Sequence, residues 1–326
     1  MSDEHAPRHE RDGHDQPHAA TRSSATATRA FAYGTLINLG YTAIEAGYGF
    51  ATHSLALLSD ALHNFGDVLG LALAWGAVWL AQRRPTDTHT YGWRRATQLA
   101  PLVNSLILVA FCGALLSEAV RRLLDPPAIP ALPVIVVAAI GIVVNLGSAW
   151  FLREDPLGPS SASSAVHGHD LNRHGAYLHL MADAAVSLAA VLAGVGMYWL
   201  GWRWLDPALA LLVSLVIAAT SWGLLRESFR QNMDAVPGHL NLTEVQAALE
   251  AMAGVVAVHH LHVWSLGGHE IALTAHVLRS TPDGHDAFID SADEALNARF
   301  GINHTTLQIE FGPGCAHDCD DLAPHH

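Results

Sequence analysis

Two copies of one short motif, His-x-x-x-Asp, lie inside long apolar stretches of this sequence. The first is His63 with Asp67, and the second is His179 with Asp183. Residues four apart share one face of an α-helix, so each motif points an imidazole and a carboxylate in the same direction. Two such helices packed face to face would surround one point with two nitrogens and two oxygens. That is a tetrahedral ligand set suited to Zn²⁺.

A simpler interpretation exists for one motif alone, because a histidine or aspartate on a membrane helix can form an interhelical hydrogen bond. Two copies are harder to explain in this way, since four buried polar groups would all need partners. Two carboxylates and two neutral imidazoles make bound Zn²⁺ formally neutral, whereas the empty site approaches neutrality by taking up protons. Metal and protons should therefore compete for the site, which predicts cation/proton antiport by alternating access.

Six apolar runs must position these residues, each near the roughly 20 residues that cross a bilayer as a helix. They are predicted at residues 29–52, 55–81, 99–120, 132–152, 176–200 and 205–225. Only 14% of the 326 residues are charged, and 51% are hydrophobic. Soluble domains carry about 25% charged residues, so the lipid bilayer is the expected environment. Most arginines lie before the first run, after the last run, or in the connections between runs two and three and between runs four and five. Arginine-rich connections favour the cytoplasmic side of a membrane, so both termini are predicted to be cytoplasmic.

The overall composition excludes some partners and favours others. A net charge of −13 and the absence of lysine argue against nucleic acid, which needs a basic surface. The 22 histidines are a first hint of metal. Residues 1–28 lack the apolar core of a signal peptide and are expected to form a disordered, histidine-containing tail. The predicted organisation continues with a transmembrane transport domain at 29–226, a cytosolic metal-binding and dimerisation domain at 227–315, and a tail at 316–326.

Beyond residue 226 the hydrophobic runs shorten, and helix and strand patterns alternate. Asn241 with Glu244 forms a capping-box signature before a short helix. Two strands follow, joined at Gly267-Gly268, and then a helix and a last strand. The predicted unit is a small α+β domain in the order αββαβ. Strict strand alternation would place His260 and His262 on one face of the sheet and His259 on the other.

Other polar residues in the apolar runs have two interpretations. Asp60, one turn before His63, is either an entry ligand or proton carrier, or a polar residue at the helix end near the interface, which we favour. For Glu45, Asn38, Asn104 and Asn145, interhelical hydrogen bonding is the default and pore lining is the alternative. We keep Asn104 with Asp60 as auxiliary candidates for the transport site.

With these motifs the sequence resembles the cation diffusion facilitator family. The matching stretches are Ser54-Leu-Ala-Leu-Leu-Ser-Asp60-Ala-Leu-His63 with Asp67, Thr90-Tyr-Gly-Trp-Arg-Arg-Ala96, Glu118-Ala-Val-Arg-Arg-Leu-Leu-Asp-Pro-Pro127, His179 with Asp183, Val258-His-His-Leu-His-Val-Trp-Ser265 and His304-Thr-Thr-Leu-Gln-Ile-Glu310. The resemblance implies a six-helix homodimer that exports divalent cations, with a metallochaperone-like cytosolic domain. It also implies a transport site from the second and fifth spans, in the branch that favours zinc.

The same resemblance implies further metal ligands in the cytosolic domain. His259, His276 and Glu310 match such ligand positions, and Cys315 and Cys319 fall where some relatives add thiolates. His260 and His262 are auxiliary candidates. Zn²⁺ would then be both the substrate and a regulatory ion that draws two cytosolic domains together. The alternative is an ordinary half-buried sheet face. The lysine-free, alanine- and arginine-rich composition suggests a bacterium with a GC-rich genome, and hence the inner membrane.

Two rival functions share the intramembrane histidines and aspartates. An intramembrane zinc-dependent enzyme needs an open coordination position and usually a general base. Four protein ligands leave no vacancy, and no base is obviously placed. A membrane-anchored metal sensor would not need ionisable residues deep within its spans. The sequence therefore predicts a transporter rather than an enzyme.

Overall fold

A computed structural model of the chain describes residues 37–153, 166–268 and 270–311. Five of its helices are long and apolar enough to cross a bilayer. They are α2 (Leu55–Ala81), α3 (Ala96–Leu124), α4 (Ala131–Arg153), α5 (Val166–Leu200) and α6 (Leu205–Asn232). The first predicted span, 29–52, lies only partly within the described residues. Its described part, 37–52, is helical. The predicted helical membrane domain is thus confirmed.

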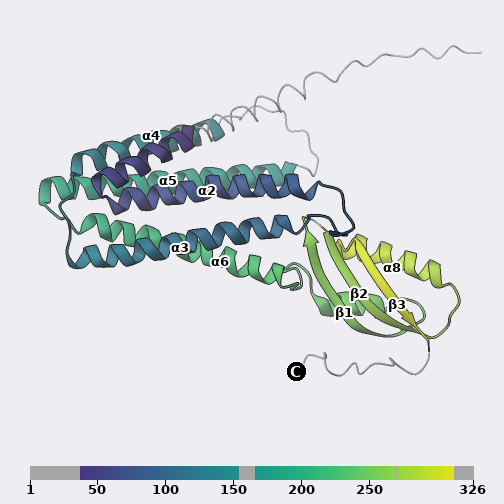
Figure 1. Ribbon diagram of the computed structural model, residues 1–326. Helices are drawn as coiled ribbons and strands as arrows, with labels where there is room; N and C mark the ends of the chain where they lie inside the picture. The colour runs from purple at the N-terminus through teal and green to yellow at the C-terminus, as the bar shows by residue number, and fades with distance from the viewer. Residues whose placement is uncertain (1–36, 154–165, 269, 312–326) are drawn as a thin grey trace, which may run out of the picture.

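The long helices lie side by side in one bundle, with a small sheet domain at one end (Figure 1). Helix α3 packs mainly against α6, and α4 packs against α5. Helix α2 contacts α3, α5 and α6, and therefore joins these two pairs. This central position brings α2 against α5, the two helices that carry the His-x-x-x-Asp motifs.

The start of α2 is fixed by a buried carboxylate from another helix. Ser54 is the N-cap of α2, and its hydroxyl accepts a hydrogen bond from the Leu57 amide. Asp206, on the first turn of α6, accepts from the Ser54 hydroxyl at 2.5 Å and from the Leu55 amide at 2.9 Å. The first amides of a helix lack partners within it, so this carboxylate satisfies them and complements the helix dipole. Ser54 and Asp206 are 152 residues apart, so the sequence does not predict this link between α2 and α6.

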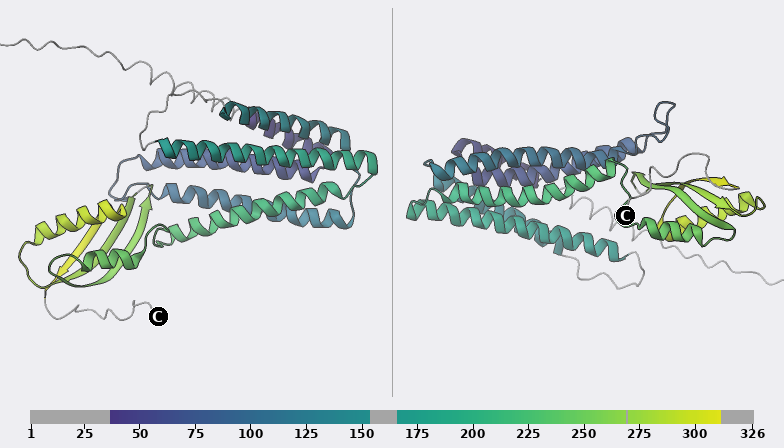
Figure 2. Two further views of the ribbon diagram at one scale, coloured as in Figure 1. Left: turned by 180° about the vertical axis from the view of Figure 1, so that it is seen from behind. Right: turned by 90° about the horizontal axis from the view of Figure 1, so that it is seen from below.

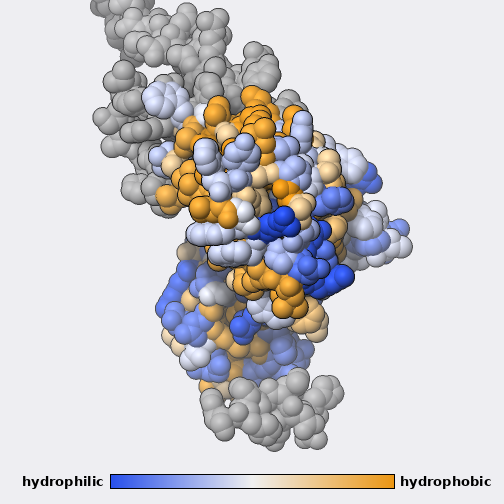
Figure 3. Space-filling model, turned by 90° about the vertical axis from the view of Figure 1, so that its left-hand side faces the viewer, coloured by the Kyte–Doolittle hydropathy of each residue, from blue (hydrophilic) through white to orange (hydrophobic). Residues whose placement is uncertain are grey.

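The outer surface of the bundle is apolar. Trp75 on α2 is 75% exposed and Trp199 on α5 is 78% exposed. Figure 3 looks along the molecule from the bundle end far from the sheet and shows broad hydrophobic patches over the bundle. Apolar surface on this scale would be a liability in water, and it is the surface that lipid covers.

The sheet domain has the predicted αββαβ order. Its elements are α7 (Leu242–Glu250), β1 (Val255–Gly267), β2 (Glu270–Arg279), α8 (His285–Phe300) and β3 (His304–Glu310). The strands lie in the order β1-β2-β3, with β1 antiparallel and β3 parallel to β2. Parallel pairing requires a crossover, which α8 supplies. Figure 2 shows the sheet and its helices from two further sides.

One face of the sheet packs against both helices, and the other does not. The core combines side chains of α7 and α8, such as Leu249 and Leu296, with inward-facing strand residues, such as Leu273 and Val277. His276 alternates with these inward-facing positions on β2, so it lies on the face away from the helices. Its neighbour across the parallel pair is Gln308, two residues before Glu310 on the same strand. Polar residues of β2 and β3 are thereby gathered on the helix-free face.

Strand β1 contains a bulge that overturns the predicted alternation. Val258 and Val263 both belong to the core although they are five residues apart, which a regular strand cannot achieve. The pairing runs from His259 with His276 to His262 with Thr274, so β1 holds one extra residue there. His260 takes up the extra length in the left-handed region, with φ 48°. The prediction that His259 and His262 face opposite sides is therefore wrong.

The β1–β2 turn is docked on the start of α3. The Gly268 amide donates to the Thr97 hydroxyl at 2.9 Å, and the Gln98 side-chain amide donates to the Ser265 carbonyl at 3.2 Å. Arg94 forms an ion pair with Glu270 beside them. These contacts join the sheet domain to the bundle end where α2 finishes and α3 begins.

Candidate metal centre

The structure brings all four predicted intramembrane residues close together. The His179 Nε2 atom lies 3.0 Å from Asp67 Oδ2 and 3.6 Å from Asp183 Oδ2. The His63 Nε2 atom lies 3.4 Å from Asp183 Oδ1 and 3.9 Å from Asp67 Oδ2. Each imidazole therefore meets the carboxylate of its own helix and that of the other helix.

These separations suit a single small cation. Ligand atoms about 2.0–2.1 Å from a tetrahedral Zn²⁺ lie roughly 3.3–3.4 Å from one another. The four nitrogen–oxygen distances, 3.0 to 3.9 Å, lie around that value. His63, His179 and Asp183 each present a ligand atom within 4.8 Å of the other two. These three residues can hold one divalent ion, and Asp67, which lies outside this group, contacts it through His179 at 3.0 Å as the candidate fourth ligand.

Exposure of the four side chains is uneven. The side chains of Asp67 and His179 are 41% and 45% exposed, whereas that of Asp183 is 2% exposed. Asp67 lies one turn closer than His63 to the end of α2 that adjoins the sheet domain. The two helices run in opposite directions here, because Asp67 faces His179 while His63 faces Asp183. The more exposed pair of side chains, Asp67 and His179, therefore lies toward the sheet domain, and the buried Asp183 lies farther from it.

The two auxiliary candidates lie beside the site, outside the group of convergent atoms. Asn104 on α3 packs against Gly70, where an added Cβ would be 3.0 Å from its amide nitrogen. Asp60 is 2% exposed and accepts a 3.4 Å hydrogen bond from the Ser187 hydroxyl. The favoured interpretation of Asp60 as a polar helix-end residue near the interface is therefore wrong, because the carboxyl is buried between helices. The sequence did not predict this contact, because Ser187 is a single serine in an apolar run.

A second group of ligand-type atoms lies on the helix-free face of the sheet. Glu310 Oε1 is 2.9 Å from His276 Nδ1, and Glu310 Oε2 is 3.3 Å from His259 Nε2. One ligand atom from each residue lies within 4.8 Å of the others. Three protein ligands leave a position for a fourth donor. The bulge in β1 is what turns His259 toward His276.

Two further histidines flank this triad. The His260 ring centroid lies 4.9 Å from that of His276, and the His262 ring lies 6.4 Å from that of His260. Among the described residues, neither belongs to the group with convergent ligand atoms. Cys315 and Cys319 lie outside the described residues.

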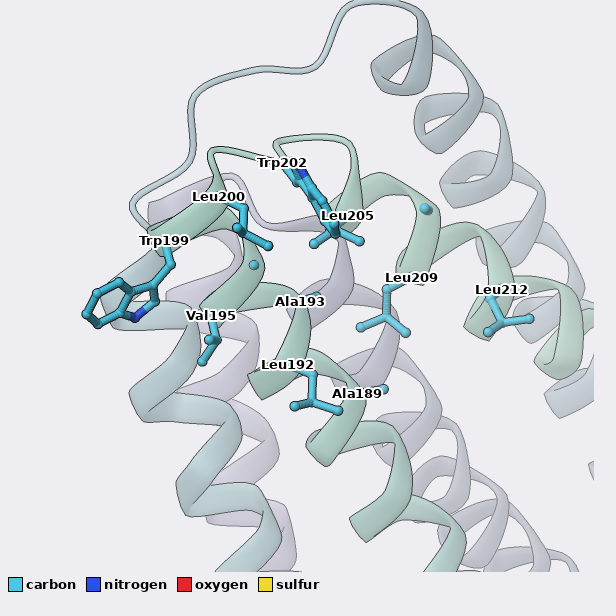
Figure 4. A pocket seen from close by; sticks show the side chains of 12 residues that line it. Ala189, Leu192, Ala193, Val195, Trp199, Leu200, Trp202, Leu205, Leu209 and Leu212 are labelled. Atoms are coloured by element: carbon cyan, nitrogen blue, oxygen red, sulfur yellow. The ribbon is translucent and has the colours of Figure 1, made fainter.

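An apolar pocket occupies a different part of the bundle. It measures about 680 Å³ and lies between the end of α5 and the start of α6 (Figure 4). Leu192, Trp199, Trp202 and Leu209 are among its lining residues, none of which is ionisable. A pocket with no histidine, cysteine or carboxylate side chain offers no ligands for a divalent cation. It is distinct from the His-Asp centre.

Sequence comparisons identify both halves of the molecule. The model of the cation efflux transmembrane domain matches residues 32–231, and that of the cation efflux protein cytoplasmic domain matches residues 237–311.

Several bacterial transporters are similar over most of their length. The zinc transporter ZitB of Escherichia coli (strain K12) is 33% identical over 295 residues, which is 89% of this chain and 90% of that protein. The cadmium, cobalt and zinc/H(+)-K(+) antiporter of Bacillus velezensis is 30% identical over 91% of this chain and 92% of its own length. The metal cation efflux system protein CzcD of Cupriavidus metallidurans is 34% identical over 81% of each chain.

The apolar helices and these matches make the protein a multi-pass integral membrane protein of a bacterial inner membrane. Its relatives are transporters and not enzymes. The resemblance seen in the sequence is confirmed, and the chain belongs to the cation efflux family, also called the cation diffusion facilitators.

Proposed function

We propose that His63, Asp67, His179 and Asp183 bind Zn²⁺ and carry it out of the cytoplasm in exchange for protons. The observation that carries this proposal is the mutual approach of two imidazoles and two carboxylates from α2 and α5. The names of its relatives support zinc as a substrate, and one of them is described as a cadmium, cobalt and zinc antiporter that uses H⁺ and K⁺.

Proton exchange follows from the charge of the ligand set. Two buried carboxylates without a cation repel each other in a medium of low dielectric constant. Imidazoles gain protons in the empty site, and metal displaces these protons when it binds. One or two protons would then enter for each metal ion that leaves. Release of the metal would leave the site ready to bind protons, and release of the protons would leave it ready to bind metal.

The accessible side of the site supports export from the cytoplasm. Asp67 and His179 open toward the bundle end that carries the sheet domain. The arginine-rich α2–α3 connection lies at the same end, and its Arg94 pairs with Glu270 of the sheet domain. Arginine-rich connections favour the cytoplasmic side. We therefore place both termini in the cytoplasm and assign the described state as inward-open.

A regulatory role for the sheet domain fits its separate ligand triad. His259, His276 and Glu310 would bind a second zinc ion, with the fourth position open to water, a cysteine of the C-terminal tail or a partner subunit. A shared ion of this kind would hold two sheet domains together, as expected for a homodimer. Cys315 and Cys319 supply the type of ligand that such a position accepts.

Transport in reconstituted vesicles tests the proposal. The wild type should accumulate Zn²⁺ in response to a proton gradient, with Co²⁺ and Cd²⁺ compared side by side. His63→Ala should abolish accumulation, whereas His239→Ala, which removes an exposed histidine outside both sites, should leave it unchanged. Transport by His63→Ala at the wild-type rate would refute the assigned site. Wild-type transport that ignores the proton gradient would refute antiport alone.

A further inference from the structure

A closed cluster of polar side chains lies one helical turn from the metal centre. It consists of Tyr41 and Glu45 on the helix at 37–52, Asp60 and Asn64 on α2, and Ser187 on α5. None of the five is more than 4% exposed. Asp60 precedes His63 by three residues, and Ser187 follows Asp183 by four, so the cluster lies on the side of the centre away from the sheet domain.

Hydrogen bonds and close packing connect four helices in this cluster. The Tyr41 hydroxyl donates to Glu45 Oε1 at 2.9 Å and lies 3.3 Å from the Val137 carbonyl oxygen of α4. The Glu45 carboxyl faces the Asp60 carboxyl and the Asn64 amide. Gly141 of α4 leaves the necessary space, since an added Cβ would lie 2.3 Å from the Tyr41 hydroxyl and 3.0 Å from that of Ser187.

Several polar atoms of the cluster have no hydrogen-bond partner. They are Glu45 Oε2, Asp60 Oδ1 and both side-chain polar atoms of Asn64. An unsatisfied buried polar group costs about 1–3 kcal/mol, so such atoms are normally explained by an unseen water or proton. Four of them in one place indicate a position where water or a proton is bound.

The charges of the cluster favour a proton. Glu45 and Asp60 face each other, and among the described residues no arginine interacts with either carboxyl. Two adjacent carboxylates in a dry interior cannot both remain ionised without a countercharge. One proton converts a carboxylate oxygen into a donor and removes the repulsion, as in other carboxyl pairs that share a proton.

We propose that Glu45, paired with Asp60, is a proton-binding site separate from the four metal ligands, and that protons returning from the side away from the sheet domain pass through it. This inference rests on the proposed antiport. Glu45 belongs to a helix that supplies no metal ligand. The titratable groups that face it are Tyr41 from its own helix and Asp60 from α2, beside the Asn64 amide. Toward α5, Asp60 accepts a hydrogen bond from Ser187, which lies one helical turn from Asp183, while α4 offers only the Val137 carbonyl and Gly141.

The decisive variant is Glu45→Gln, which keeps the shape of the side chain but cannot release a proton. Purified wild type and variant are reconstituted in vesicles, and Zn²⁺ uptake and internal pH are followed together. We expect zinc affinity within about threefold of the wild type, because the ligands are untouched. We expect gradient-driven uptake to fall at least about tenfold, while zinc-for-zinc exchange continues.

The outcomes separate this inference from the antiport on which it rests. A Glu45→Gln protein with the wild-type ratio of protons to zinc overturns the inference and leaves antiport intact. Wild-type uptake without proton movement overturns both. If Glu45→Gln does not fold, Tyr41→Phe replaces it, since it removes only the hydroxyl that donates to Glu45. The pH profile of uptake should then shift, and an unchanged profile overturns the inference.

Discussion

The two ligand clusters of this protein use the same side-chain chemistry on different backbones. The intramembrane centre is built from two helices, each of which supplies a histidine and an aspartate four residues apart. The cytosolic triad is built from three strands, and His259 reaches it only because β1 contains a bulge at His260. Helical spacing therefore makes the first cluster predictable from the sequence, whereas the second cluster depends on a local irregularity of one strand.

The clusters also differ in how deeply their most important carboxylate is buried. Asp183, the most buried ligand of the bundle site, is 2% exposed, whereas Glu310, the carboxylate of the triad, is 16% exposed. A buried carboxylate depends on its partners far more strongly than an exposed one does. Loss of Asp183 should thus be far more damaging than loss of a ligand in the sheet.

The largest effect is expected for Asp183→Asn. The substitution retains the shape of the side chain but removes one of the two charges that neutralise the cation. Breaking a buried charge interaction costs about 3–5 kcal/mol, which corresponds to roughly a hundredfold to a thousandfold or more in zinc affinity. Calorimetric titration of the purified protein measures this change. Near wild-type affinity for the intramembrane ion would show that Asp183 is not a ligand.

A smaller effect is expected for His276→Ala. The protein should bind one zinc ion fewer per chain, because the remaining pair of ligands is too weak a site. Transport should decline only about fivefold, the low end of couplings of about 1–3 kcal/mol between distant sites. Metal content by mass spectrometry and vesicle uptake test the two parts. Complete loss of transport with normal folding would contradict the division into transport and regulatory sites.

The contact between the two regions can be broken at the β1–β2 turn. Gly267 has φ 108°, and an added Cβ would be 2.2 Å from the Arg94 carbonyl oxygen. Gly267→Ala should therefore destabilise the docking of the sheet domain on α3 by about 1–3 kcal/mol.

Gly268→Ala is the matched control. Gly268 also has a positive φ, 64°, but nothing lies within 4 Å of its added Cβ. Only the backbone strain of about 1–2 kcal/mol remains there. Thermal unfolding of the full chain in detergent compares the variants. Equal losses would show that the Arg94 contact contributes nothing.

The sequence predicted the helical site better than the strand site for a physical reason. An α-helix has a regular period, so His63 and Asp67 had to share a face, and only the packing of α2 on α5 had to be added. A strand keeps its alternation only while no residue is inserted. His260 gave no warning of a bulge, because left-handed backbone is usually signalled by glycine or asparagine.

The buried cluster was missed for a related reason. Tyr41, Glu45, Asp60 and Ser187 come from three separate segments, and each has an ordinary role on its own helix. Their convergence depends on how the helix at 37–52 and α5 approach α2. Gly141 leaves the space for this approach, but a single glycine in an apolar helix has many explanations.

The smallest predicted effect is a change in stability on substitution at the bulge in β1. The sign of this change tests whether the bulge is at His260. His260 adopts φ 48°, a conformation that costs a residue with a Cβ roughly 1–2 kcal/mol relative to glycine. His260→Gly should therefore stabilise the protein by about 1 kcal/mol when a chelator removes metal from both sites. His262→Gly, at a paired position of the same strand, should destabilise it by about 0.5–1 kcal/mol, because glycine weakens a regular strand. Opposite signs in chemical denaturation would confirm that the extra residue is at His260. Destabilisation by both would mean that β1 is regular there, and His259 would then face away from His276.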